Sequence, residues 1–359
     1  MEMENQNSTV THFVFLGFSN EPLIQTFLFI TFLLIYLITL MGNIIIMMII
    51  RGKSSLHGPM YFFLSHLSFI DICFSSVTVP KLLANVCGNW RISYNGCITQ
   101  LFFIFLLGTV EVFVLAAMAY DRYAAICKPL HYVQIMNQAF CRKLVGGAWV
   151  IAFTHASANT IPAMKLVFCG PNIIKHFSCE LPSLLALSCS ETFLNSVTFF
   201  ISAVILISFS LFLILWSYFN IVSSVLKIHS AEARRKTFST CSSHLIVVIL
   251  YFSTGCLRNM RTNSASSIVM EEYFSIQYTI STPMLNPIIY SLKTKEVMEA
   301  IKKLIRSKIV TIHFWEDICK NENPKINEDY IEGRLNLVIG VHAVSLLGFP
   351  SLACPPVCL

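Results

Sequence analysis

The stretch PLIQTFLFITFLLIYLITLMGNIIIMMII, residues 22–50, decides the fold class, because it contains no charged side chain. A helix that crosses a bilayer needs about 20 apolar residues. Six further stretches are long and apolar enough, and only Asp71 and Glu111 are acidic within them. None alternates with a period of two, so a seven-transmembrane, all-α helix bundle is predicted rather than a β-barrel. The six stretches are 60–79, 97–120, 144–164, 192–226, 237–257 and 273–292.

The composition of the whole chain agrees with a lipid environment. Of its 359 residues, 55% are hydrophobic and 12% charged, whereas soluble domains carry about 25% charged residues. These values exclude an ordinary soluble enzyme, a disordered chain and a disulfide-rich mini-protein. The net charge of +6 comes from short clusters between the apolar stretches, which indicates orientation in a bilayer and no nucleic-acid partner.

The charge clusters orient the chain. Basic residues such as Arg51, Lys128 and Lys227 follow the first, third and fifth stretches, and residues 1–21 contain no Lys or Arg. The positive-inside rule therefore predicts an extracellular N-terminus, residues 1–21, and a cytoplasmic C-terminus. No cleavable signal peptide is visible. The sequon at Asn7 lies on the predicted outside and is a candidate glycosylation site.

Four motifs carry a family resemblance. Residues 118–132 read MAYDRYAAICKPLHY and residues 56–65 read LHGPMYFFLS. Residues 236–245 read KTFSTCSSHL and residues 283–292 read PMLNPIIYSL. In this order they resemble the signatures of olfactory (odorant) receptors, within the rhodopsin-like (class A) G-protein-coupled receptor family. The resemblance covers about Val10 to Lys308 and implies a receptor domain over residues 22–292.

The resemblance implies an activation switch at the inner ends of the helices. Asp121 is expected to hold Arg122 in the resting state, and released Arg122 would help to form the G-protein pocket. The structural alternative is that the Arg122 side chain only extends its charged group to the membrane–water interface. Pro287 should kink the seventh helix, either as an activation hinge or as a purely structural bend. The switch and coupling residues are Asp121, Arg122, Tyr123, Tyr218, Asn286, Pro287 and Tyr290.

A polar cluster is predicted in the bundle interior, formed by Asn43, Asp71 and Glu111 with Asn286 and Tyr290. Carboxylates inside a membrane are functional suspects. The resemblance implies a cation or water site there, with a sodium ion near Asp71 and Glu111. The alternative is that one or both carboxyl groups are protonated and hydrogen-bonded. No other cofactor or metal is expected.

Cysteines on the predicted outside can be oxidised. Cys97, Cys169, Cys179 and Cys189 allow three connectivities. The receptor resemblance implies a Cys97–Cys179 disulfide, which leaves Cys169–Cys189; the Cys97–Cys189 pairing is the main competitor. His176-Phe177-Ser178-Cys179-Glu180 has the shape of a soft-metal site, but packing of the loop is the preferred interpretation, because a disulfide-bonded cysteine is no thiolate ligand.

The ligand site is expected between the outer halves of the helices, as is usual for helix bundles. Phe105, Gly108, Thr109 and Val112 fall on one helical stripe. The ligand residues that the resemblance implies are mainly apolar and lack the acidic anchor of amine receptors. Such a set favours a small, largely uncharged volatile ligand. The set is Ile104, Phe105, Gly108, Thr109, Val112, His155, Asn159, Ser202, Ala203, Leu206, Ile207, Phe252, Gly255, Cys256, Asn259, Ile276 and Thr279.

Two regions depart from the family pattern. Arg258 and Arg261 are unusual near the outer end of the sixth stretch; pairing with Glu271 and Glu272 is favoured over contact with a polar odorant. Residues 293–308 are expected to form a juxtamembrane amphipathic helix. Residues 309–359 form an atypical tail, expected to be disordered, whose prolines leave too few helical positions for an eighth span.

These observations together imply a multi-pass plasma-membrane odorant receptor. Its expected partners are a small-molecule odorant, the lipid bilayer and a heterotrimeric G protein of the stimulatory olfactory type, which raises cAMP. It is not expected to be an enzyme, because no nucleophile–base set, phosphate loop or zinc motif is found. A transporter or channel is the first rival, although no internal repeat supports it. The second rival is a receptor that no longer signals, because its tail or the changes in the sixth stretch have damaged it.

Overall fold

The computed structural model describes residues 10–16, 21–169, 172–259, 275–293 and 298. Contacts divide the chain into Met1–Val297 and Met298–Leu359, and the fold below is that of the first unit. Several predictions lie outside the described residues or side chains. They are the Asn7 sequon, the pairing of Arg258 and Arg261 with Glu271 and Glu272, the amphipathic helix at 293–308 and the tail at 309–359.

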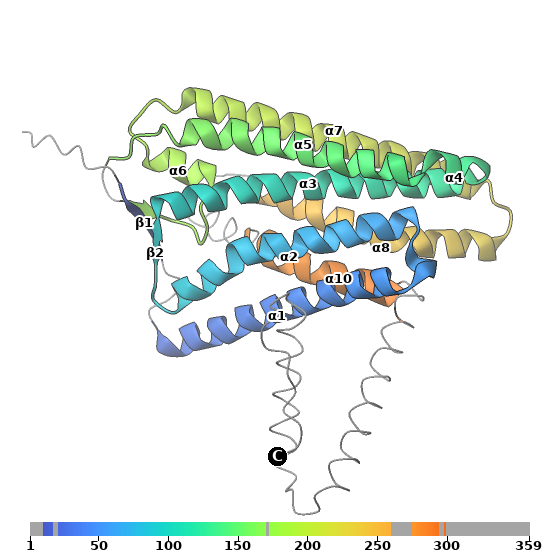
Figure 1. Ribbon diagram of the computed structural model, residues 1–359, viewed down its shortest axis with the longest axis horizontal. Coiled ribbons are helices and arrows are strands. Elements are labelled where there is room, and N and C mark those ends of the chain that lie inside the picture. Colours follow the sequence, from blue (N-terminus) through green and yellow to red (C-terminus); the bar gives the residue numbers. More distant parts are fainter. Residues whose placement is uncertain (1–9, 17–20, 170–171, 260–274, 294–297, 299–359) are drawn as a thin grey trace, which may run out of the picture. The chain divides into compact units, whose positions relative to one another are not determined.

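The seven predicted stretches each fall on helical structure, so the predicted fold class is confirmed (Figure 1). The helices are long because apolar residues run through them without a break, and prolines begin α1 and α2 at the position that tolerates them. The bounds are α1 Pro22–Gly52, α2 Pro59–Val86, α3 Tyr94–Cys127, α5 Gln138–Ala163, α7 Phe193–Leu226, α8 Ala231–Asn259, and the π-helical η3 Gln277–Ser281 continued by α10 Thr282–Lys293. Short connecting helices are η1 Ser54–Leu56, η2 Pro129–His131, α4 Tyr132–Ile135 and α6 Leu181–Leu187.

The surface of the bundle is apolar where a soluble protein would be polar. Leu23 of α1 and Phe219 of α7 are 83% and 72% exposed. By length and hydropathy, α1, α2, α3 and α7 each suffice to cross a membrane, and α8 contains the shorter apolar segment Cys241–Gly255. Polar residues lower the hydropathy of α5, including His155 and Asn159, and these two contribute to the interior site described below.

Helix α3 is the centre of the bundle and packs against α2, α5 and α7, with α8 also in contact (Figure 1). Its buried residues Val110 and Leu115 join one large apolar core with Leu67 and Ile70 of α2. On the other side, α1 packs against α2 and α10. A Cβ at Gly42 would lie 3.1 Å from the Pro287 ring, so glycine allows α1 to approach α10 closely.

A small sheet lies at the end of the bundle where α3 begins (Figure 1). Strand β1, His12–Phe15, is its centre; it pairs antiparallel with β2, Arg91–Ser93, and parallel with β3, Ile173–Ile174. Phe13 and Phe15 are fully buried against the segment between α5 and α7 and against the start of α3. The N-terminal segment was expected only as an extracellular extension, because a strand of four residues gives no periodic signal of its own.

Two disulfides fasten the loop between α5 and α7. Cys97 of α3 is bonded to Cys179, and Cys169 is bonded to Cys189. This confirms the predicted connectivity and excludes the Cys97–Cys189 alternative. The first bond fixes the loop to the outer end of α3, and the second closes the loop on itself.

Candidate ligand site and inner switch

The polar centre of the candidate ligand site joins α3 to α5. Thr109 Oγ1 lies 2.9 Å from Nδ1 of His155, and both side chains stand among apolar neighbours. The Phe105 ring meets the His155 ring edge-on, with centroids 5.4 Å apart. Within the described part of the chain, His155 Nε2 is buried and has no hydrogen-bond partner. An unpartnered imidazole nitrogen in an apolar setting is a ready contact for one polar group of a ligand.

Asn159 extends this chain of contacts to α7. Its amide nitrogen donates to the His155 carbonyl at 2.9 Å and to Ser202 Oγ at 3.3 Å. Its amide oxygen is buried and has no partner among the described residues. Four of the predicted ligand residues, Thr109, His155, Asn159 and Ser202, are therefore brought together across three helices.

A second group of contacts surrounds Gly108. The Tyr251 hydroxyl of α8 donates to the Gly108 carbonyl at 3.0 Å and lies 2.8 Å from the Tyr278 hydroxyl of η3. A Cβ at Gly108 would lie 3.2 Å from the Tyr278 hydroxyl. Tyr251 and Tyr278 were not among the predicted site residues. A signal for Tyr278 existed, since it is the immediate neighbour of the predicted Thr279.

The remaining predicted ligand residues differ in where the structure places them. Thr279 and Val112 are buried, whereas Ile207 is 39% exposed, close to the values of the apolar outer face. The exposure of Ile207 suits lipid contact and does not support a place in the interior site. The side chains of Cys256 and Asn259 lie outside the described part of α8. The half-buried members are Ile104, Phe105, Gly108, His155, Ser202, Ala203, Leu206, Phe252, Gly255 and Ile276.

The predicted polar cluster is buried in the bundle. The Asn286 amide nitrogen donates to both carboxyl oxygens of Asp71, at 3.2 and 3.0 Å. The Glu111 carboxyl lies within electrostatic range of Asp71, and one of its oxygens has no partner among the described residues. Asn43 differs from expectation: its amide nitrogen donates to the backbone carbonyls of Thr39 and Pro283. It thereby ties α1 to α10.

At the C-terminal end of α3 the Asp121 carboxyl has two partners. Asp121 Oδ1 accepts a hydrogen bond from the Tyr132 hydroxyl at 2.8 Å. The Arg122 guanidinium interacts with the same carboxyl electrostatically, and no ion pair within 4 Å joins the two among the described residues. Arg122 is buried, with one guanidinium nitrogen unpartnered among the described residues. Burial and the Asp121 carboxyl raise the pKa of Tyr132, so this hydroxyl remains a donor at physiological pH.

Tyr218 and His244 join the three helices α7, α8 and α3. The Tyr218 hydroxyl of α7 lies 2.8 Å from His244 Nδ1 of α8, and the two rings stack. His244 Nε2 lies 3.0 Å from the Leu115 carbonyl of α3. Tyr218 was a predicted switch residue. His244 was not, although it stands in the quoted motif at 236–245, because nothing in that motif states which α3 carbonyl it would meet.

The loop motif at 176–180 packs on itself. His176 Nε2 lies 3.5 Å from Glu180 Oε1, and the Ser178 hydroxyl contacts both side chains. Cys179 is in the disulfide and is no thiolate. Across the described ranges, no group of three or more His, Cys, Asp or Glu side chains is arranged to hold a metal ion.

Comparison with known proteins gives one family. The sequence model described as olfactory receptor matches residues 32–308. The chain is 49% identical to human "Olfactory receptor 8S1" over 292 residues, 81% of each chain. It is 48% identical to human "Olfactory receptor 5A1" over 305 residues, which is 85% of this chain and 97% of the relative. It is 45% identical to mouse "Olfactory receptor 7A40" over 309 residues, 86% of this chain and 100% of the relative.

Proposed function

The chain belongs to the olfactory receptor family, and from this premise we propose which ligand it detects and how it signals. Members of this family are multi-pass plasma-membrane receptors for odorants that couple to G proteins, and they are not enzymes. We propose that this receptor binds a small, mostly apolar volatile molecule between α3, α5 and α7. Binding then activates a stimulatory olfactory-type G protein, which raises cAMP. The N-terminus is extracellular and the C-terminus cytoplasmic.

The observation that carries the ligand proposal is the unpartnered Nε2 of His155. A neutral imidazole carries one N–H. When Thr109 donates to Nδ1, Nε2 is the donor and suits a carbonyl, ether or hydroxyl oxygen of the ligand. When Nδ1 donates to Thr109, Nε2 is an acceptor and suits a hydroxyl. In both cases the free nitrogen of His155 offers one polar contact beside the apolar ring of Phe105.

Signal transfer is proposed to run through α8. Two side chains of this helix meet backbone carbonyls of α3: Tyr251 meets Gly108 in the outer half, and His244 meets Leu115 in the inner half. A ligand that displaces Tyr251 or Tyr278 weakens the outer contact, and an outward movement of α8 breaks the inner one. Arg122 lies at the inner end of α3, where the G protein would bind.

The polar cluster supports a finer proposal, a sodium ion near Asp71 and Glu111. Sodium is a hard cation that prefers oxygen ligands, and the cluster offers two buried carboxyl groups, with one Glu111 oxygen unpartnered among the described residues. The ion would neutralise charge that is otherwise costly inside a membrane. Protonation of a carboxyl group is the competing explanation. Agonist potency that is unchanged when choline replaces sodium would favour protonation.

The function is tested by expressing the full chain in cells with a cAMP reporter and screening a broad panel of odorants. We expect at least one dose-dependent response. His155→Phe should weaken that response, because it removes both imidazole nitrogens while keeping a flat ring. Trp149→Phe is the matched aromatic control, since Trp149 lies on the same helix outside the site. Equal potency in the parent and His155→Phe would contradict the assigned polar contact.

A further inference from the structure

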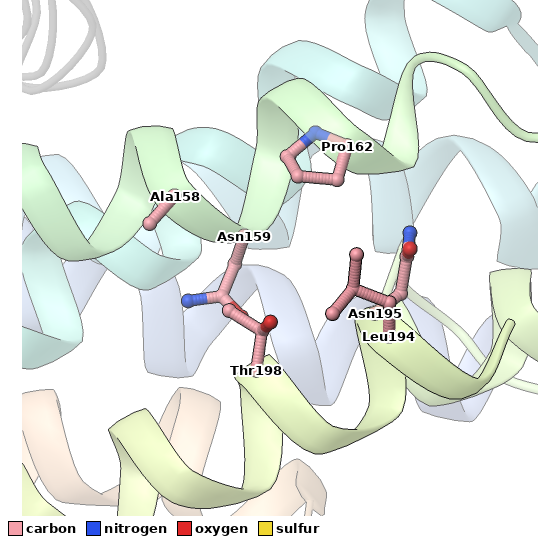
Figure 2. Close-up of a pocket in the computed structure, with 6 residues that line it drawn as sticks. All are labelled: Ala158, Asn159, Pro162, Leu194, Asn195 and Thr198. Carbon is pink, nitrogen blue, oxygen red and sulfur yellow. The ribbon is translucent and has the colours of Figure 1, made fainter.

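A pocket opens between the outer ends of α5 and α7 (Figure 2). It has a volume of about 120 Å³. Ala158, Asn159 and Pro162 line it from α5, and Leu194, Asn195 and Thr198 line it from α7. Ala158 and Leu194 are exposed on the apolar outer surface, so the pocket is reached from the lipid side of the bundle.

Several polar groups at this pocket have no protein partner. Within the described residues, the amide oxygen of Asn159 and the amide nitrogen of Asn195 are buried and unpaired. Pro162 lies inside α5 and has no backbone N–H, so the Ala158 carbonyl loses its helical donor. Asn159 itself is only 3% exposed. The pocket thus presents unmatched acceptors and an unmatched donor at a position where lipid tails satisfy neither.

The unmatched groups define the chemistry of an occupant. A hydroxyl group both donates and accepts, whereas an aldehyde or ketone oxygen only accepts and an alkane does neither. The volume is below the roughly 150 Å³ of a cavity that holds benzene, so it fits a hydroxyl group and its first few carbons. The rest of the molecule would lie along the exposed apolar side chains of α7, such as Leu194 and Ile201.

We propose that this pocket is a membrane-facing binding site for the hydroxyl end of a small aliphatic alcohol dissolved in the bilayer. It is separate from the interior site, but Asn159 belongs to both. The amide nitrogen of Asn159 donates to Ser202 and the His155 carbonyl, its oxygen is buried without a partner among the described residues, and the residue is part of the pocket lining. An occupant that holds this amide fixes its orientation toward the interior site. The proposal goes beyond the receptor function and does not depend on signalling.

The test uses the purified full chain in phospholipid nanodiscs and a diazirine-bearing 1-octanol as photolabel. Illumination should place adducts on residues 158–162 and 194–198. Excess 1-octanol should suppress them, and octane or octanal should do so far less. Asn195→Leu should weaken the competition by 1-octanol about two- to tenfold, the effect of one hydrogen bond. Ala158→Leu should fill the pocket and remove most adducts.

Ala139→Leu is the matched control, since Ala139 is exposed on α5 outside the pocket, and it should label as the parent does. Nanodiscs with cholesterol distinguish two sources of the hydroxyl group: suppressed labelling assigns the site to a membrane sterol, and unchanged labelling assigns it to a free alcohol. Adducts absent from both segments of the parent would overturn the proposal. Equal competition by octane, or full labelling of Ala158→Leu, would overturn it as well.

Discussion

Single polar atoms set the geometry of this receptor at the residue scale. His244 and Tyr251, both of α8, meet carbonyls of α3, and Thr109 and His155 join α3 to α5. Each contact lies in a low-dielectric interior, where an unpaired polar group is costly. The positions of these atoms, more than the apolar lining, therefore define the site and the switch.

Thr109→Val tests the polar centre of the ligand site. Valine keeps the shape of threonine but removes the hydroxyl group, so the hydrogen bond to His155 is lost. A cost of about 0.5–1.5 kcal/mol corresponds to up to roughly tenfold in agonist potency. Thr154→Val is the control, because the Thr154 hydroxyl donates to the Val150 carbonyl of its own helix and to no other described residue. Dose–response curves that coincide for the parent and both variants would place the ligand elsewhere.

Tyr132→Phe tests the hydrogen bond that the Asp121 carboxyl accepts from Tyr132. Phenylalanine leaves the buried Asp121 carboxyl without its hydrogen bond, which should cost about 1–3 kcal/mol of stability. The apparent melting temperature of the receptor in nanodiscs should therefore fall. Tyr120→Phe is the comparison, since the Tyr120 hydroxyl makes no hydrogen bond within the described residues. An equal effect of the two substitutions would remove the special role given to Tyr132.

At the scale of elements, the helices could be predicted and the sheet could not. Charge-free runs such as residues 22–50 specify a helix locally, because in lipid the backbone must satisfy its own hydrogen bonds. Strand β1 depends on partners near residues 92 and 173, and four residues carry no signal of that pairing. The Asp121–Arg122 switch stays a prediction: the two groups interact electrostatically, and the sequence did not reveal that Tyr132 also binds the Asp121 carboxyl.

The π-helical turn η3 places Tyr278 beside Gly108, and Gly108→Leu tests this close approach. A side chain at this position meets the Tyr278 hydroxyl and should disturb the contacts among Tyr251, Tyr278 and α3. Potency should fall more than for Thr109→Val, because volume as well as a contact is lost. Gly147→Leu is the matched control, since nothing lies within 4 Å of a Cβ there. A Gly108→Leu receptor with parental potency would contradict the packing described.

The Cys97–Cys179 bond fixes the loop between α5 and α7 to α3, and Cys97→Ser tests it. Loss of such a bond costs about 2–5 kcal/mol, so maturation and delivery to the cell surface should fail. Cys87→Ser is the control, because Cys87 is free and exposed. Surface staining of unpermeabilised cells measures both. Normal delivery of Cys97→Ser would show that the bond is dispensable.

At the scale of the molecule, the bundle has polar groups inside and apolar groups outside. Asp71, Glu111, Asn286 and Arg122 are buried, whereas the outer faces of α1 and α7 are apolar. The sequence predicted this arrangement, and the family resemblance implied the disulfide connectivity that the structure shows. The ligand residues that the resemblance implies stay a prediction. The sequence did not single out Tyr251 and His244, because both meet backbone carbonyls of α3, and residue type does not show where a carbonyl lies. Nor did it single out Tyr278, whose partner is the Tyr251 hydroxyl.

The central claim is that odorant binding in the bundle activates a G protein through the inner end of α3. The most direct measurement compares agonist-induced cAMP in the parent and Arg122→Ala at matched surface levels. Arg142→Ala is the control, since its guanidinium bonds to Gln138 of the same helix. We predict a dose-dependent response in the parent and the control, and none in Arg122→Ala. A response that survives Arg122→Ala unchanged would contradict the account.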